Sequence, residues 1–385
     1  MQHNNTYLAS KPRYEILDGL RGVASLIVVA FHIFEIYSHS PVEQIINHGY
    51  LAVDFFFVLS GFVIGYAYDD RWNRMSLKDF FKRRLVRLHP MVIMGSVIGA
   101  LLFFFADSPA FSEIGGTAWW QVILILILGC TMLPALTSWD IRGWGETNPL
   151  NGPTWSLMFE YIANILYALI IRHFSKTVLA IFVVATAFLT IDLTMNLDVF
   201  NLFSEGRGAP YTVIGGWSAT PGQLYLGATR LLYPFFMGSL LSRMNKLIKV
   251  KRGFWWCSVI ITVMLAMPRI GGTENMWMNG AYDAFCILVM FPLIVAMGAG
   301  SNVKGARSVA ICTFLGEISY PLYITHYPLI YMLTGWAHNH PDASQGTIIF
   351  QGVATFILSI GVAYACLKLY DIPVREWLRK HWLMK

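Results

Sequence analysis

The chain has 385 residues, of which 56% are hydrophobic, 15% aromatic and only 13% charged. Soluble domains carry about 25% charged residues, so this composition, with a mean hydropathy of +0.54, excludes an ordinary water-soluble protein and places the chain in a lipid bilayer. It also excludes disordered, collagen-like and solenoid classes, and the net charge of +6 comes without a basic domain that would bind nucleic acid.

Eleven apolar runs approach the length of a membrane-spanning helix, which needs about 17 to 25 residues at a rise of ~1.5 Å each. In chain order they cover residues 22–38, 49–68, 91–106, 118–136, 154–171, 177–194, 225–242, 253–269, 281–299, 309–333 and 347–368. The sequence therefore predicts an all-α fold, a polytopic bundle of transmembrane helices that forms one domain over residues 1–385.

Lysine and arginine are unevenly distributed among the connecting segments. They gather over residues 71–87 and 243–252, whereas three loops contain neither residue, at 39–48, 107–117 and 334–346. Because short cytoplasmic loops collect positive charge, the basic segments are predicted to lie inside and the other loops outside.

Both chain ends are predicted to be cytoplasmic tails, at residues 1–13 and 371–385, which requires an even number of crossings. One of the apolar runs therefore cannot be a full span. We expect the run at 118–136, which Gly129 and Pro134 interrupt, to be re-entrant or interfacial, and the bundle to have about ten spans.

Five ionisable side chains fall inside these apolar runs, where each costs about 2.5 to 3.5 kcal/mol to insert. They are His32, Asp54, Glu160, Arg230 and His326. Counted from the outer ends of their runs, all five are predicted to lie in one layer, roughly 8 to 10 Å below the outer rim. Structural alternatives exist: an intramembrane histidine can bridge two helices, Glu160 can pair with Arg230, and Asp54 can simply hold His32.

A second group of polar residues is predicted nearer the inner surface. Arg21 and His32 are eleven residues apart, close to three helical turns, so both project from one helix face, roughly 16 Å apart. Arg84 and Arg87 alternate with Phe and Leu, which predicts an interfacial amphipathic helix, although such a run can also be only a topology determinant. The five cysteines show no metal-ligand spacing, so no metal site is expected.

Five sequence blocks carry a resemblance to a known family. They are LDGLRGVASLIVVAFH from Leu17, VDFFFVLSGFVIG from Val53, KRRLVRLHP from Lys82, TWSLMFEYIANILY from Thr154 and GEISYPLYITHYPLI from Gly316. In this order and spacing they resemble the acyltransferase 3 family of integral-membrane O-acyltransferases, over about residues 14 to 370. We expect no appended periplasmic esterase-like domain of the kind that larger members of that family carry.

The resemblance implies that an acyl group, usually acetyl, passes from acyl-CoA at the cytoplasmic face to a hydroxyl of a saccharide or glycolipid at the bacterial inner membrane. Carried over residue by residue, it implies a catalytic group and a donor-binding group. The catalytic group is His32, Asp54, Glu160 and His326, and the group that binds acyl-CoA is Arg21, Arg84 and Arg87. Arg230, by its place in its span, is assigned to acceptor binding.

Acyl transfer to an alcohol needs a base, a polarised carbonyl and a site that excludes water. In our hypothesis His32 is the general base and Asp54 fixes its tautomer, while the arginines hold the donor phosphates. Glu160, Arg230 and His326 would position the acceptor or stabilise the oxyanion. Ser60 and Ser156 are less favoured as nucleophiles because neither lies in a strand-turn-helix elbow.

Two functions from other classes use the same polar residues. A proton-coupled transporter would use His, Asp and Glu as a relay, and a glycan-lipid flippase would perform no chemistry. Neither explains Arg84 and Arg87 in register with Arg21, and the two halves of the chain show no inverted repeat. The outer loops at 137–153 and 195–224 carry aromatic residues that can stack on sugars or form an interfacial belt.

Overall fold

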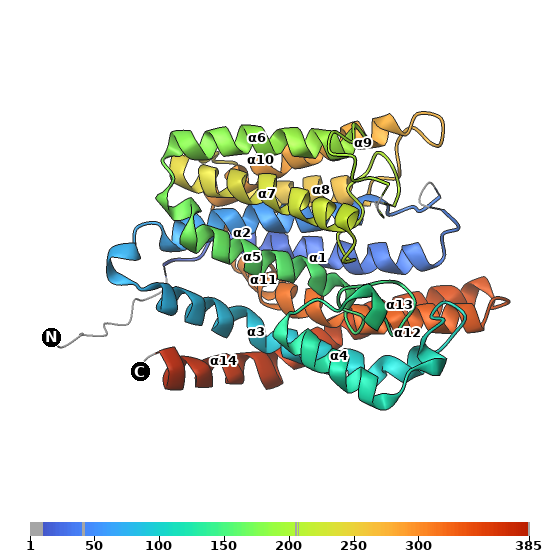
Figure 1. Ribbon diagram of the computed structural model, residues 1–385. Helices are drawn as coiled ribbons and strands as arrows, with labels where there is room; N and C mark the ends of the chain where they lie inside the picture. Colours follow the sequence, from blue (N-terminus) through green and yellow to red (C-terminus); the bar gives the residue numbers. More distant parts are fainter. Residues whose placement is uncertain (1–10, 41–42, 205, 207, 384–385) are drawn as a thin grey trace.

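A computed structural model describes residues 11–40, 43–204, 206 and 208–383, and residues 1–10 of the expected N-terminal tail lie outside this part. The described residues form helices and loops, with no β-strand among them. In Figure 1 the long helices lie side by side along one common direction. This arrangement confirms the predicted all-α bundle.

The α-helices follow one another along the described part of the chain with short connections between most of them. In chain order they are α1 (Glu15–Ile36), α2 (Ala52–Tyr68), α3 (Leu77–Leu102), α4 (Trp119–Thr131), α5 (Trp155–Leu169), α6 (Lys176–Thr194), α7 (Pro221–Met244), α8 (Gly253–Ala266), α9 (Trp277–Phe285), α10 (Phe291–Gly300), α11 (Ala306–Thr325), α12 (Tyr327–Asn339), α13 (Gln345–Cys366) and α14 (Ile372–Leu378).

Within the described residues, seven helical segments are long and apolar enough to cross a membrane. Four of the predicted runs are not among them, those at 225–242, 253–269, 309–333 and 118–136. The last of these is the run that we expected to be re-entrant or interfacial. It forms α4, which has 13 residues and ends where Met132 adopts a left-handed backbone with φ 60°. At ~1.5 Å per residue α4 is about 20 Å long, shorter than a hydrocarbon core of about 30 Å. Its length fits a re-entrant or interfacial segment.

The basic run and the apolar run after it form one helix, contrary to the prediction of a separate interfacial helix. α3 begins at a capping box, in which the Ser76 and Asp79 side chains bond each other's backbone N–H groups, and continues past Pro90 to Leu102. Pro90 removes one backbone hydrogen bond, and in a packed bundle neighbouring helices make such a loss tolerable. Arg84 therefore lies on a rigid helix.

The predicted span at 309–333 divides into two helices at His326. α11 ends at Thr325, and α12 starts at Tyr327 with Pro328 in its first turn. Proline has no N–H to donate and is favoured in the first turn of a helix. The division places the His326 side chain at the junction between α11 and α12.

The expected C-terminal tail is helical as far as Leu383, where the described part of the chain ends. After α13 the chain continues through a π-helical turn at Leu367–Asp371, α14, and a second π-helical turn at Arg379–Leu383. Figure 1 shows α14 beside the beginning of α3. The segment predicted as a C-terminal tail is thus helical, and Lys82 of α3 holds it through Trp382.

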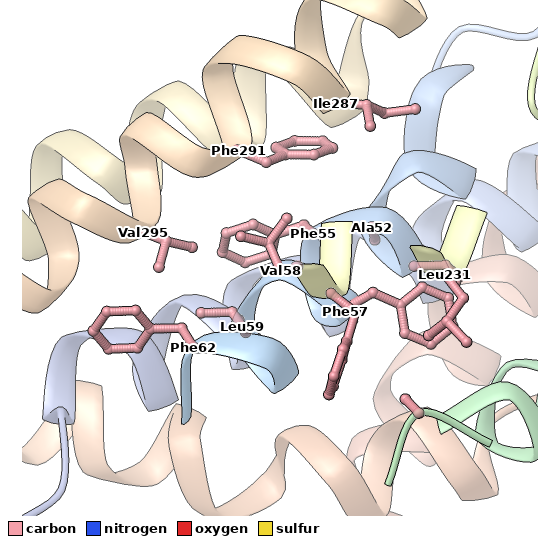
Figure 2. Packing of buried hydrophobic residues seen from close by; sticks show 14 of the residues in the cluster. Ala52, Phe55, Phe57, Val58, Leu59, Phe62, Leu231, Ile287, Phe291 and Val295 are labelled. Atoms are coloured by element: carbon pink, nitrogen blue, oxygen red, sulfur yellow. The ribbon is translucent and has the colours of Figure 1, made fainter. Parts of the chain in front are cut away.

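α2 lies at the centre of the main hydrophobic core. Figure 2 shows Phe55, Phe62 and their neighbours on α2 packed among residues of α7, α10 and the π-helical turn before α10, including Leu231 and Phe291. α2 and α7 approach closely at two glycines. A Cβ atom at Gly61 would overlap the carbonyl oxygen of Phe235, and one at Gly238 would overlap that of Val58. Small residues at such crossings allow close packing of helices in membranes.

Replacing Gly238 with leucine should therefore separate α2 from α7. Overpacking against side chains costs about 1 to 3 kcal/mol, and here the obstacle is backbone, so we expect at least that loss in the unfolding free energy of Gly238→Leu. Thermal denaturation of the detergent-purified protein measures it. Gly361→Leu is the matched control, because a Cβ at that helical glycine meets no atom within 4 Å. Equal melting temperatures in the two variants would contradict the prediction.

Candidate functional site

A cavity of about 940 Å³ lies among α1, α2, α3, α5, α11 and the helical segment that follows α13. This segment, residues 367–383, is called the C-terminal helical segment below. Its wall includes Arg21, Arg84 and Arg87, the three residues predicted to bind a donor. Ligand pockets commonly have volumes of about 300 to 1,000 Å³. The structure thus brings the three predicted arginines together around one space large enough for an extended small molecule.

The cavity wall is rich in charge and has a positive excess. Its cations are Lys11, Arg13, Arg21, Arg71, Arg83, Arg84, Arg87, Arg375 and Arg379. Its acidic residues are Glu15, Asp18, Glu160, Glu317, Asp371 and Glu376. Nine positive charges against six negative ones favour an anionic ligand, and guanidinium groups suit phosphate because they bind it in a bidentate manner.

Glu160 lines this cavity together with Arg84. Its Oε1 accepts hydrogen bonds from Arg84 Nη2 at 2.8 Å and from Ser60 Oγ at 3.1 Å. Glu160 was predicted in the outer layer and Arg84 near the inner surface, so this contact shows that their predicted separation in depth was wrong. Depth was counted from the ends of apolar runs, whereas α5 has 15 residues and α3 has 26, so equal counts do not mark equal positions.

Asp54 pairs with Arg230 instead of His32. Arg230 Nη2 donates to Asp54 Oδ2 at 2.8 Å and to the Tyr50 carbonyl at 2.6 Å, and Nη1 donates to the Gly215 carbonyl at 3.1 Å. Both side chains are buried, Asp54 completely. The predicted tautomer-fixing contact between Asp54 and His32 is thus not formed, and the Arg230 guanidinium is used inside the protein, which leaves it poorly placed to bind an acceptor.

His32 and His326, which lie 294 positions apart in the sequence, are stacked. Their ring centres are 5.6 Å apart with planes 26° from parallel. Tyr327 packs edge-on against His32 with ring centres 4.8 Å apart. His326 is fully buried, whereas the His32 side chain is 17% exposed. Of the five residues predicted to lie in one layer, His32 therefore stacks on His326, and Asp54 pairs with Arg230. Glu160 lines the cavity.

Hydrogen bonds determine which ring nitrogen of each histidine carries the lone pair. His32 Nδ1 lies 2.9 Å from Glu35 Oε2. His326 Nδ1 lies 3.0 Å from the carbonyl oxygens of Leu322 and Tyr323. These oxygens only accept, so Nδ1 donates in both rings and Nε2 is the basic atom. His326 Nε2 is buried without a hydrogen-bond partner among the described residues. Glu35, not Asp54, is the carboxylate that orients His32.

Tyr323 lies between the cavity and the histidine pair. Its side chain lines the cavity and its ring centre is 6.1 Å from that of His326. Its hydroxyl is 2.7 Å from Ser156 Oγ, another lining atom. Neither His32 nor His326 lines the cavity. A molecule that filled the cavity would therefore end one side chain away from the two basic nitrogens.

The loop between α4 and α5 and the helix α12 support the histidine pair. Tyr327 packs against Tyr331 with ring centres 4.6 Å apart, and the Tyr331 hydroxyl donates to Glu146 at 2.5 Å. The Arg142 guanidinium lies over the Tyr331 ring, 3.7 Å from its centre. Burial raises the pKa of Glu146 to about 7. No sequence pattern singled out Glu146, because its partner lies 185 positions away.

The Asp54–Arg230 pair yields a stability prediction. Removing one member of a buried pair typically costs about 3 to 5 kcal/mol, because the other charge is left uncompensated. We expect Asp54→Asn to lose about this much unfolding free energy, and Asp54→Leu combined with Arg230→Met to recover most of it. Thermal denaturation in detergent is the measurement. If Asp54→Asn retained full stability yet lost all enzymatic activity, Asp54 would be catalytic instead.

The raised pKa of Glu146 predicts a pH dependence. The folded protein binds this proton more tightly than the unfolded chain, where the ordinary pKa is 4.5. Its stabilisation is therefore complete below pH 4.5 and is lost as the pH rises toward 7, at about 1.4 kcal/mol per pKa unit. Melting temperatures between pH 4.5 and 8 should fall less steeply in Glu146→Gln than in the wild type. The exposed Glu113→Gln variant is the control, and an unchanged slope in Glu146→Gln would refute the assignment.

Comparison with known proteins identifies the family of the chain. A family model described as an acyltransferase domain matches residues 14–368. Acyltransferase MdmB of Streptomyces mycarofaciens is 25% identical over 378 residues, 91% of this chain and 90% of that protein. O-acetyltransferase OatA of Staphylococcus aureus is 23% identical over 390 residues, 95% of this chain but 58% of OatA. A protein named protein 2 in the picA locus of Rhizobium radiobacter is 31% identical over 168 residues, 40% of this chain and 81% of that protein. No solved structure matches.

Proposed function

Because the chain belongs to the acyltransferase 3 family, we propose that this membrane acyltransferase moves an acyl group, usually acetyl, from acyl-CoA to a hydroxyl of a cell-surface or lipid-linked saccharide. The donor would enter from the cytoplasm of a bacterial cell with the protein in its inner membrane and both termini inside. The observation that carries the proposal is the arginine-rich cavity that ends beside two stacked histidines.

The cavity fits an acyl-CoA donor in volume and in charge. Arg21, Arg84 and Arg87 offer guanidinium groups to its phosphates, and Arg84 Nε is buried without a hydrogen-bond partner among the described residues. Tyr323 and Ser156 line the cavity with uncharged hydroxyl groups, which suits the pantetheine and its thioester. With the phosphates at the arginines, the thioester would lie nearest the histidine pair.

In the proposed reaction His32 Nε2 removes the proton from the acceptor hydroxyl as its oxygen attacks the thioester carbonyl. The C–O bond forms, the C–S bond breaks, and the leaving thiolate takes the proton back from His32. Glu35 would stabilise the imidazolium, because a carboxylate at Nδ1 favours the charged ring. His326 Nε2 has no hydrogen-bond partner among the described residues. It would accept a hydrogen bond from a second polar group of the acceptor and so orient the acceptor. Tyr323 would have to move aside for the thioester to reach His32.

Turnover of acetyl-CoA by the purified protein, with membrane glycan as acceptor, tests the function. Removal of a general base costs about 10² to 10⁴ in rate, so we expect His32→Ala to lose at least a hundredfold in kcat while retaining the wild-type melting temperature. Glu35→Gln should lose less, because it removes only the orienting charge. Protein that carries a solute across vesicles without consuming acetyl-CoA would instead be a transporter.

Donor binding is tested separately by the KM for acetyl-CoA. Arg87 lines the cavity and its side chain is exposed, so Arg87→Ala should fold and raise this KM about tenfold, because a charge-assisted hydrogen bond contributes about 1.5 kcal/mol or more. Lys246→Ala removes an exposed positive charge that does not line the cavity and should leave the KM unchanged. Equal effects of the two variants would mean that only the overall charge matters.

A further inference from the structure

The C-terminal helical segment forms a wall of the cavity. Lys82 Nζ on α3 donates to the Trp382 carbonyl at 3.2 Å and lies over the Trp382 ring, 5.3 Å from its centre. These contacts dock the second π-helical turn on the first two turns of α3. The segment lies far from the Arg84 region in the sequence, and no motif connects the two.

One face of this segment points at the cavity. Asp371, Arg375, Arg379 and Leu383 all line it, and each is four residues after the one before, the spacing of neighbours on one helix face. Lys380, next to Arg379, is exposed and does not line the cavity. The segment thus presents two guanidinium groups to the same space as Arg84 and Arg87.

The polar atoms on this wall are only partly satisfied within the protein. Arg375 Nη2 lies 2.8 Å from Asp371 Oδ2. Arg375 Nε and Asp371 Oδ1 are buried without a hydrogen-bond partner among the described residues, and so is Arg84 Nε on the opposing helix. The charge of Arg87 interacts with both Asp371 and Arg375. α3 and the C-terminal helical segment thus direct guanidinium N–H groups into one space. The protein supplies fewer acceptors there than these donors can use.

We propose that Arg375 and Arg379, together with Arg84 and Arg87, form a binding site for the phosphate groups of the donor nucleotide. The proposal rests on the proposed function and extends it, because it assigns donor recognition to the C-terminal segment. Lys82, which holds this segment, lies six residues before Leu88 on α3. The Leu88 carbonyl accepts a hydrogen bond from Tyr320, which precedes Tyr323 by three residues on α11. A donor with its thioester at Tyr323 would therefore have its nucleotide end here, and the phosphate monoester on the ribose is the group placed against Arg375 and Arg379.

A comparison of two donors isolates this phosphate. Acetyl-CoA carries the ribose phosphate monoester and acetyl-dephospho-CoA lacks it, so the ratio of their kcat/KM values measures its recognition. We expect the wild type to prefer acetyl-CoA at least tenfold and Arg379→Gln to lose most of that preference. Arg375→Gln with Arg379→Gln should reduce the ratio to about one. Lys380→Gln, which removes the same charge from the same segment, should keep the wild-type ratio.

Two further measurements separate the possible outcomes. Calorimetric binding of adenosine 3′,5′-bisphosphate needs no catalysis, and it should weaken about tenfold in Arg379→Gln and remain unchanged in Lys380→Gln. Binding that is sensitive to Arg379 in a protein without acetyl-CoA turnover would support the phosphate site and reject the acyl-transfer function. An unchanged donor ratio in a folded Arg379→Gln variant would overturn the proposal.

Anionic phospholipid is the other source of phosphate at this position. The donor ratio is therefore measured in nanodiscs of phosphatidylcholine alone and with phosphatidylglycerol. The proposal expects the Arg379→Gln effect in both. An effect that appears only with phosphatidylglycerol would assign Arg375 and Arg379 to lipid headgroups and would overturn the donor assignment. Asp371 is buried and loses its partner in Arg375→Gln, so the single Arg379→Gln variant keeps the test valid if the double variant fails to fold.

Discussion

A charge buried in a membrane protein must find its partner on another segment, because lipid offers no hydrogen bonds to satisfy it. This constraint organises the present structure. Arg230 on α7 donates hydrogen bonds to Asp54 of α2 and to two backbone carbonyls. Arg84 on α3 pairs with Glu160 of α5, and Arg243 on α7 pairs with Asp69 after α2. Each pair joins segments that are distant in the sequence.

The pairing also separates structural from functional polar groups. Asp54 and Arg230 use their hydrogen-bonding capacity on each other and on neighbouring backbone, so they stabilise the bundle without an atom to spare for a ligand. Atoms that lack partners among the described residues gather elsewhere. His326 Nε2 lies beside His32, and Arg84 Nε and Arg375 Nε lie on the cavity wall. We propose the chemistry and the donor binding at these atoms.

Much of the architecture was predictable, because it depends on local composition. Apolar runs of helical length predicted the all-α bundle, and the breaks at Gly129 and Pro134 indicated that the segment of α4 is short. Glu35 was within reach too, since residues three apart share a helix face, yet an apparent match in depth favoured Asp54. The depth argument failed because it counted residues from the ends of the apolar runs, and the helices do not begin and end where those runs do. α3 starts well before its apolar run, and the run at 309–333 divides into α11 and α12 at His326.

The sequence by itself determined that this chain lies in a membrane, that it belongs with the acyltransferases, and that Arg21, Arg84, Arg87, His32 and His326 are functional candidates, because composition, charge and short motifs are local properties. Only the tertiary structure decided which charges neutralise one another, that His32 stacks on His326, and that the C-terminal segment lines the cavity. Such contacts depend on how helices tens to hundreds of residues apart pack. That packing is determined by the fit of side chains and glycines at their crossings, which no local pattern encodes.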